Sequence, residues 1–404
     1  MRRLDKKIVS NTVYTIGSAL LMNGVLQLII NPVLNRIMGD DQMGFMLYIM
    51  GLAAIVCPSV GQALNTSRLV VRRKYDVSNG DYNVLILLLG GIGTIITLVI
   101  AKSSLRHVPD YIFTIVLLMF TAFRYYGDVE YRLSLKYKNY FHYYAVLTGG
   151  YLLGLILYLV TDNWFLVYIT GEMGALLYVA FTGQIFYPYF KTTKYFTKAL
   201  QRGGFLVISY LINNISLNID RIVLKNMINN EAVTQYYVAS LIGKTLVILV
   251  APINTILISY LTKKEDNIKK KQYLVLTGIG CVVSILFFIC SSIATPIFVK
   301  IFYGADMYQS VASILILVNI TQILNMFSSY LLMIVLSFTE EKLQMILQSV
   351  YMLVMVILVV AGTYKYGIMG FTISALIANA LRALIVFFLG FCKVKAAISE
   401  NTME

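Results

Sequence analysis

Three basic residues interrupt long apolar stretches of this sequence, and they are its clearest candidates for chemistry: Arg124, Lys244 and Arg382. A cation at the centre of a membrane helix costs about 2.5–3.5 kcal/mol on insertion scales, so its presence there needs a reason. Lys244 and Arg382 have no acidic residue three or four positions away, which favours a role in facing an anion. Arg124 is followed by Asp128 and Arg132 at i+4 and i+8, a ladder that could neutralise itself and only anchor its helix.

Side-chain amides and hydroxyls recur at helical spacing in three apolar segments. The three stripes are Asn23, Gln27, Asn31 and Asn35; Ser209, Asn213, Ser216 and Asp220; and Asn319, Gln322, Asn325 and Ser329. Amides cannot face hydrocarbon cheaply, so they bond to neighbouring helices or line a polar cavity. For a single amide the helix–helix bond is the better interpretation. For whole stripes on corresponding helices, the pattern favours a cavity lining.

About twelve apolar segments must position these residues, each near the ~20 residues that a helix needs to cross a bilayer. Of the 404 residues, 59% are hydrophobic and 13% are charged, which is far from an ordinary soluble domain. The segments run at about 8–30, 41–64, 82–101, 110–128, 141–161, 164–186, 203–226, 236–261, 272–294, 308–336, 343–363 and 367–390. The sequence therefore predicts an all-α polytopic membrane protein.

The excess of basic residues follows the expected topology. The chain has 33 Lys and Arg against 19 Asp and Glu, and 23 of the 33 lie on one side if the N-terminus is cytoplasmic. The opposite loops hold seven: Arg36, Lys102, Arg106, Arg221, Lys225, Lys300 and Lys365. Positive charge collects on the cytoplasmic side of membrane proteins, which predicts both termini inside. The basic charge is thus topological, and we expect no nucleic-acid partner.

The segments divide into two sets of six at the basic stretch 191–202. We expect an N-terminal lobe over 1–190, a cytoplasmic linker over 191–202 and a C-terminal lobe over 203–404. Pro58 and Pro252 lie at matching depths in segments 2 and 8, so the halves look like a duplicated unit in the same orientation. Proline-interrupted helices at equivalent positions point to a site between two halves. Pro32, Pro58 and Pro252 are the candidate hinges.

Acidic residues in the apolar segments are few, and Asp128, Glu172 and Asp220 are the candidates for binding a coupling ion. The four cysteines and two histidines form no ligand cluster, so the sequence predicts neither a metal nor a cofactor. Gly150 and Gly154, four residues apart in segment 5, predict a close helix–helix contact. Arg68, at the inner end of segment 2, is consistent with either snorkelling or a function.

Short motifs next to the segments resemble the polysaccharide-transport branch of the MOP (multidrug/oligosaccharidyl-lipid/polysaccharide) exporters, which includes Wzx-type O-antigen flippases. The motifs are Asn31–Arg36 followed by Gly39–Gly44, Asn218–Arg221 followed by Glu231–Tyr237, Phe302–Asp306, and Tyr366–Gly370. The resemblance extends over nearly the whole chain, although each motif is short. The stretch after Arg221 departs from the family because it lacks glycines often seen there, which leaves the subfamily open.

The resemblance implies two six-helix lobes around a central cavity that opens alternately to each face of the bacterial inner membrane. It also implies an undecaprenyl-diphosphate-linked oligosaccharide as cargo, with no enzymatic activity. Buried cations suit the diphosphate and amides suit the sugar hydroxyls. Coupling to H⁺ or Na⁺ and contact with other polysaccharide-assembly membrane proteins are further expectations.

Two alternatives stay open. A multidrug or cation antiporter of the same architecture should carry carboxylates deep in its cavity, and segment 1 has none between Ile8 and Asn35. A membrane glycosyltransferase or polymerase would ordinarily need a large extramembrane loop or an acidic catalytic pair outside the bilayer, and the sequence indicates neither.

We predict that both termini and the loop Lys263–Lys271 are cytoplasmic. In a chain without its native cysteines, Lys269→Cys should react with an impermeant maleimide only after the membrane is opened. Lys102→Cys, in a loop on the opposite side, should react in intact cells. Labelling of intact cells at position 269 would contradict the predicted orientation.

Overall fold

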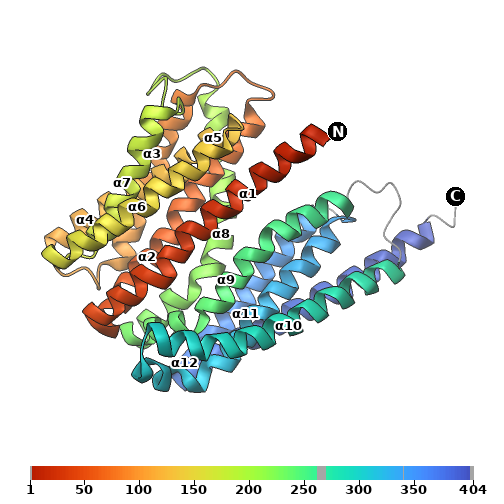
Figure 1. Ribbon diagram of the computed structural model, residues 1–404. Helices are drawn as coiled ribbons and strands as arrows, with labels where there is room; N and C mark the ends of the chain where they lie inside the picture. Colours follow the sequence, from red (N-terminus) through yellow and green to blue (C-terminus); the bar gives the residue numbers. More distant parts are fainter. Residues whose placement is uncertain (1, 262–269, 340, 401–404) are drawn as a thin grey trace. The chain divides into compact units, whose positions relative to one another are not determined.

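The computed structural model describes residues 2–261, 270–339 and 341–400, and the regular structure in these ranges is helical. The helices are α1 (Arg2–Val25), the π-helix η1 (Leu26–Ile30), α2 (Asn31–Val71), α3 (Asn79–Ala101), α4 (Val108–Gly127), α5 (Val129–Leu133), α6 (Tyr137–Thr161), α7 (Phe165–Thr182), α8 (Phe196–Met227), α9 (Asn230–Leu261), α10 (Lys270–Phe302), α11 (Ala305–Leu336) and α12 (Glu341–Glu400). Figure 1 shows them as long rods. Most of the predicted loop Lys263–Lys271 lies outside the described residues.

Two of the helices contain a sharp break. In α2 the break is at Gly39, whose φ of 76° suits a residue without a Cβ. In α12 it is at Tyr366 and Gly367, where Gly367 has a φ of 58°. The breaks lie where the sequence predicts the connections between segments 1 and 2 and between segments 11 and 12.

Eight helical stretches in the described residues are long and apolar enough to cross a membrane. Two of them, Ser10–Val71 with 62 residues and Ile346–Val394 with 49, contain these breaks, and each is long enough for two crossings at 1.5 Å per residue. The helix α8 is not among the eight, although it has 32 residues. The all-α polytopic membrane fold is therefore confirmed, and α8 is more polar than its neighbours.

The chain forms two compact units, Met1–Asn218 and Ile219–Glu404, and the division falls inside α8. The first part of α8 belongs to unit 1 because its polar side chains bond to α2. The hydroxyls of Tyr210 and Thr66 lie 3.1 Å apart, and Asn214 Nδ2 donates to Ser59 Oγ at 2.8 Å. The amides and hydroxyls of α8 thus replace part of the apolar packing that an ordinary membrane helix would offer.

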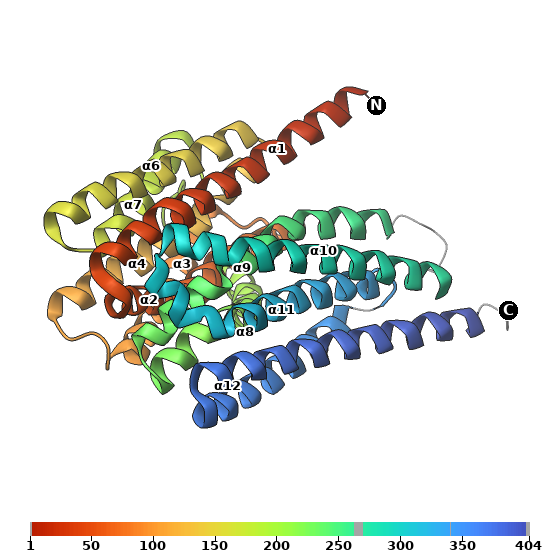
Figure 2. The ribbon, with the colours of Figure 1, turned by 60° about the horizontal axis from the view of Figure 1, so that its bottom comes forward.

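In unit 1, α6 lies along α7 and α1, and α2 packs against α3 and α4 (Figures 1 and 2). The contact between α6 and α7 depends on glycine. A Cβ on Gly150 would lie 2.6 Å from the Cα of Gly171, and one on Gly154 would lie 2.6 Å from the Cα of Val167. The close helix contact predicted at Gly150 and Gly154 is confirmed.

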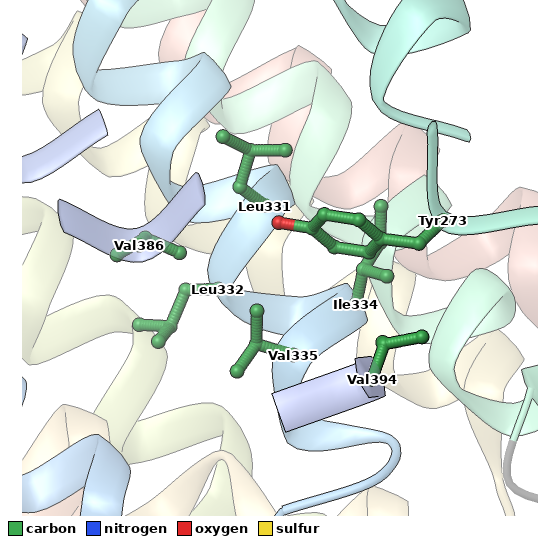
Figure 3. Close-up of a cluster of buried hydrophobic side chains, with 7 residues drawn as sticks. All are labelled: Tyr273, Leu331, Leu332, Ile334, Val335, Val386 and Val394. Atoms are coloured by element: carbon green, nitrogen blue, oxygen red, sulfur yellow. The ribbon is translucent and has the colours of Figure 1, made fainter. Parts of the chain in front are cut away.

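In unit 2, α10, α11 and α12 enclose an apolar cluster at one end (Figure 3). Its fully or nearly buried members are Tyr273, Leu331, Leu332, Ile334, Val335, Val386 and Val394. The hydroxyl of Tyr273 donates to the Phe387 carbonyl at 3.0 Å, so the one polar atom in the cluster is satisfied. This cluster packs the part of α12 that follows its break at Gly367 against α11.

The start of α3 holds the segment that leads from α7 to α8. Asn83 Nδ2 donates to the Phe186 carbonyl at 2.7 Å. The two carboxylate oxygens of Asp81 accept from the backbone N–H and the hydroxyl of Thr193, at 2.7 and 2.9 Å. A long connection without helical structure is thereby bonded to the end of the helix bundle.

The glycine contact gives a paired stability prediction. Gly150→Ala should lower the free energy of unfolding by about 1–3 kcal/mol, because the new methyl group would overlap α7. Gly149→Ala is the matched control, because a Cβ there meets no atom within 4 Å. It should be neutral or stabilise by up to about 1 kcal/mol through helix propensity. Thermal unfolding of the purified full chain measures both, and equal midpoints for the two variants would contradict the contact.

Candidate functional site

Arg124 and Glu172 form a buried ion pair between α4 and α7. Arg124 Nε lies 2.6 Å from Glu172 Oε2, and the two side chains are 6% and 1% exposed. The second carboxylate oxygen accepts from the Tyr151 hydroxyl at 3.0 Å. The guanidinium also stacks on Tyr125, with its carbon 3.9 Å from the ring centroid. The charge of Arg124 is therefore balanced inside unit 1.

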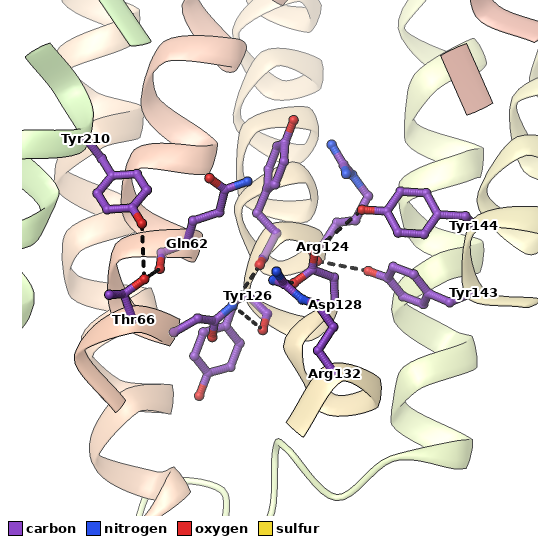
Figure 4. Close-up of polar contacts among 11 residues, drawn as sticks. Gln62, Thr66, Arg124, Tyr126, Asp128, Arg132, Tyr143, Tyr144 and Tyr210 are labelled. Atoms are coloured by element: carbon purple, nitrogen blue, oxygen red, sulfur yellow. Dashed lines mark hydrogen bonds and ion pairs between the residues drawn. The ribbon is translucent and has the colours of Figure 1, made fainter. Parts of the chain in front are cut away.

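Asp128 and Arg132 form a second pair one turn further along (Figure 4). Arg132 Nη2 lies 2.7 Å from Asp128 Oδ1, and the Tyr144 hydroxyl donates to the other oxygen at 3.5 Å. The Tyr143 hydroxyl donates to the Arg124 carbonyl at 2.9 Å. The predicted ladder is thus half formed, because Arg132 pairs with Asp128 whereas Arg124 pairs with Glu172 on another helix. The close spacing of tyrosines in α6 is the sequence signal that could have revealed this network.

The amides of the first stripe do not share one environment. Asn31 is buried, and its Oδ1 accepts from the Tyr168 hydroxyl of α7 at 3.1 Å. Asn23 is half-buried and donates to the Ala19 carbonyl of its own helix at 2.8 Å. Gln27 lies within η1 and is half-buried. The π-helix adds about one residue to its turn and so offsets the drift of a four-residue repeat, and the four amides differ in burial along the helix more than in the face that they occupy.

On α8, Asn213 is exposed. The neighbouring residue of the same helix, Asn214, bonds to α2. Asn213 is therefore the member of the second stripe whose side chain is best placed to meet a solute.

Lys244 pairs with Asp220 across the α8–α9 contact in unit 2. The distance from Nζ to Oδ2 is 2.7 Å, and the side chains are 27% and 8% exposed. The sequence shows no acid three or four positions from Lys244, but the acid comes from the preceding helix. An anion at Lys244 would have to compete with Asp220.

Asn319 and Gln322 lie in helix contacts within unit 2. Asn319 is 1% exposed, and its Nδ2 donates to Thr295 Oγ1 of α10 at 3.2 Å. Gln322 packs closely against α9, because a Cβ on Gly243 would lie 2.6 Å from the Gln322 Cβ. The Asn319 amide thus joins α11 to α10, and the side-chain stem of Gln322 packs α11 against α9.

Arg382 differs from the other two candidate cations. Its guanidinium donates to Asn325 Oδ1 at 2.9 Å and to Gln348 Oε1 at 3.2 Å, and it stacks on Tyr351 with 4.6 Å to the ring centroid. Among the side chains that the structure describes, no carboxylate lies within 4.0 Å of it. Neutral amides orient the guanidinium, and its positive charge is left without a counter-charge.

A cavity of about 100 Å³ opens beside Arg382 between α11 and the two halves of α12. Gln348 and Tyr351 contribute the other polar groups. The remaining walls are apolar: Leu332, Leu347, Val350, Val354, Ala378, Leu381, Ile385 and Val386. The site therefore offers one cation and two polar side chains within an apolar enclosure.

The candidate hinges lie in two helices. Pro32 and Pro58 are buried in α2, with Pro32 directly after η1 and Pro58 within the helix. Pro252 belongs to α9, in a stretch whose side chains fall outside the described part of the chain. The sharpest backbone change in α2 is at Gly39 rather than at either proline. It is bridged by Asn35 Nδ2, which donates to Asp40 Oδ1 at 3.1 Å.

No protein-family model and no curated protein sequence matches this chain. Solved structures do match over almost its whole length. The lipid II flippase MurJ in an inward closed conformation gives a TM-score of 0.71 at 14% identity, over 96% of this chain and 90% of that one. A multidrug resistance MATE-family transporter of the MOP superfamily, in an inward-facing conformation, gives 0.65 at 16% identity, over 96% and 95%. The likeness shows a fold shared with polytopic membrane transporters.

The buried pair in unit 1 leads to a stability prediction. Glu172→Gln should cost about 3–5 kcal/mol, because it leaves the Arg124 charge buried without its partner. The double variant Arg124→Leu, Glu172→Leu should recover most of that loss. Denaturant unfolding of the purified variants tests both. A Glu172→Gln variant as stable as the native chain would show that the pair does not stabilise unit 1.

Proposed function

We propose that this protein is a flippase that moves polyprenyl-diphosphate-linked oligosaccharide repeat units across the bacterial cytoplasmic membrane for surface-polysaccharide assembly. Two units would alternate access between the faces of the membrane. The single observation that carries the proposal is Arg382, a largely buried guanidinium without a carboxylate partner among the described residues, beside an apolar cavity.

The chemistry of Arg382 suits a diphosphate. A guanidinium offers parallel N–H donors that match two phosphate oxygens, and it stays charged when it is buried. Asn325 and Gln348 hold it by neutral acceptors, so the charge is not cancelled by the protein. A diphosphate cannot cross hydrocarbon unaided, because each unpaired charge is costly there. A fixed cation inside the membrane lowers that cost.

The apolar walls of the same cavity suit the lipid part of such a substrate. Val350, Leu381 and Ile385 line the cavity and are also exposed at the surface, so the polar end of an amphiphile could meet Arg382 while its tail stays among apolar groups. The cavity volume of about 100 Å³ admits a small polar group and not a whole sugar. The oligosaccharide would need other polar residues.

Asn23, Gln27 and Asn213 are the amides that we assign to the sugar hydroxyls. They are half-buried or exposed, whereas Asn31, Asn319 and Gln322 are buried in helix contacts. From the sequence we expect Asn31, Asn319 and Gln322 to bind the substrate directly. We now propose that they position the helices that carry the site.

Energy coupling would act through the ion pairs. Asp128, Glu172 and Asp220 each lie beside a cation, so protonation or Na⁺ binding at one of them would release that cation. We place the coupling at Asp220, because its partner Lys244 lies in unit 2, the unit that also holds Arg382. Release of Lys244 would add a second free cation to unit 2. Pro32, Pro58 and Pro252 remain the proposed bend points.

A multidrug or cation antiporter is the second candidate, and the MATE-like fold supports it. A cationic substrate needs a carboxylate that is not already neutralised. Each of the three candidate acids faces a basic side chain, whereas Arg382 faces none of them. The charge balance therefore favours an anionic substrate. A membrane glycosyltransferase or polymerase is less favoured, because MurJ and the MATE protein are a flippase and a transporter.

The experiment is binding and flipping of a fluorescent polyprenyl-diphosphate sugar by the purified chain in liposomes. Arg382→Gln should weaken the apparent affinity about ten- to a hundredfold, since a charge-assisted contact is worth about 1.5–3 kcal/mol. Lys365→Gln is the matched control, because Lys365 lies on the same helix and is exposed. Its affinity should not change.

Equal affinities for Arg382→Gln and the native chain would reject the anion site. Coupled uptake of a cationic dye, with no effect of the diphosphate sugar, would favour the antiporter.

A further inference from the structure

A second arginine, Arg68, is buried in the last turn of α2 with no acidic partner among the residues that the structure describes. Its exposed fraction is 0%, which is unusual for an arginine. The guanidinium lies between two aromatic rings, with 5.0 Å to the centroid of Tyr82 on α3 and 4.6 Å to that of Tyr126 on α4. The rings stabilise the charge from the faces of the guanidinium. They leave its N–H donors, which lie in the guanidinium plane, without acceptors.

All three guanidinium nitrogens of Arg68 lack a partner in hydrogen-bonding geometry. Among the described residues, no carboxylate lies within 4.0 Å of it. Asp81, which precedes Tyr82, is already occupied by Thr193 and Ser78. Buried N–H groups of an arginine nearly always donate hydrogen bonds, so the lack of acceptors in hydrogen-bonding geometry around Arg68 needs an explanation.

Other orphaned polar atoms lie next to Arg68 on the same elements. The buried hydroxyls of Ser67 and Tyr82 lie near each other but not in hydrogen-bonding geometry, and Asn65 Oδ1, one helical turn before Arg68, also lacks a partner in that geometry. The amide nitrogen of Asn65 is fixed, because it donates to the Tyr125 and Tyr126 carbonyls. The arrangement thus combines a guanidinium and two hydroxyls as donors with one acceptor.

From this arrangement we propose that Arg68, Ser67, Tyr82 and Asn65 form a phosphate-binding site within unit 1. The guanidinium would take two phosphate oxygens, and the hydroxyls would donate to the others. Asn65 Oδ1 would accept the proton of hydrogen phosphate or of a phosphate monoester. This acceptor selects against sulfate, which carries no proton at neutral pH. The four proposed ligands belong to α2 and α3, and the site does not depend on the proposed function.

The segment between α7 and α8 closes the site. The ring of Phe186 stacks on Tyr126 with 6.2 Å between centroids, and the Tyr126 hydroxyl donates to Asn83 Oδ1 at 2.5 Å. Exposed basic residues surround the same end of unit 1: Arg72, Arg73, Lys74, Lys191 and Lys194. They raise the local concentration of anions. A phosphate would therefore enter where this segment covers the bundle.

Two sources fit this chemistry, inorganic phosphate and a lipid with a phosphate monoester headgroup. The test measures the unfolding midpoint of the purified full chain at constant ionic strength, with potassium phosphate or potassium sulfate. A second arm uses nanodiscs of phosphatidylcholine that contain phosphatidic acid or phosphatidylglycerol. The variants are Arg68→Gln, Arg68→Lys and, as the control, Arg73→Gln.

We expect phosphate to raise the midpoint of the native chain and of Arg73→Gln in a saturable manner, and sulfate to do so less. The shift should disappear in Arg68→Gln. In Arg68→Lys, which keeps the charge without the planar fork, the apparent affinity should fall about tenfold. A shift with phosphatidic acid but not with free phosphate would assign the site to a lipid headgroup.

If Arg68→Gln does not fold, the apparent phosphate affinity of Arg68→Lys, compared with that of the native chain, tests the proposal. An identical phosphate shift in native and Arg68-substituted chains overturns the proposal. The absence of any shift in the native chain, with both free phosphate and phosphatidic acid, overturns it too and leaves Arg68 as a residue that only packs between two tyrosines.

Discussion

A charge inside hydrocarbon has to be balanced, and this requirement governs the arrangement of the helices. Arg124 and Glu172 join α4 to α7, Asp128 and Arg132 extend that pair by one turn, and Lys244 and Asp220 join α9 to α8. Each pair fixes two elements at once, because neither partner tolerates separation from the other. Tyrosine hydroxyls from α6 complete the arrangement by filling the remaining acceptor positions on the acids. The polar interior of unit 1 is a framework that the apolar packing surrounds.

Two arginines that lack an acidic partner contrast with these ion pairs. Arg382 and Arg68 both stack on tyrosine rings, and both lack a carboxylate within 4.0 Å among the described residues. They differ in what their N–H donors meet. Neutral amides hold Arg382 beside a cavity, whereas the N–H groups of Arg68 meet no acceptor in hydrogen-bonding geometry. Arg68 in unit 1 and Arg382 in unit 2 thus keep a charge that no carboxylate of the described residues neutralises.

The sequence predicts the all-α membrane fold well, because hydrophobic length is a local property. The breaks at Gly39 and at Tyr366–Gly367 fall at predicted connections for the same reason. The partners of Arg124 and Lys244 were not predictable in this way. Glu172 lies 48 positions after Arg124 and Asp220 lies 24 before Lys244, so only the packing of helices brings them together. The site residues and the lobe boundaries remain predictions, and so does the polysaccharide branch of the MOP exporters.

The π-helix η1 divides the first membrane helix into two registers. Its turn holds about one residue more than an α-helical turn, which rotates everything beyond it by roughly 100° about the helix axis. A repeat of four residues drifts by about 40° per step in a straight α-helix, so Asn23 and Asn35 would otherwise lie about 120° apart around the axis. The rotation at η1 cancels most of that drift and keeps the four amides within about 60° of one another. Asn31 and Asn35 are buried whereas Asn23 and Gln27 are half-buried, so a single polar face is packed tightly at one end and less tightly at the other. Removal of one residue between Leu26 and Ile30 would restore the drift and turn one pair of amides away from the other.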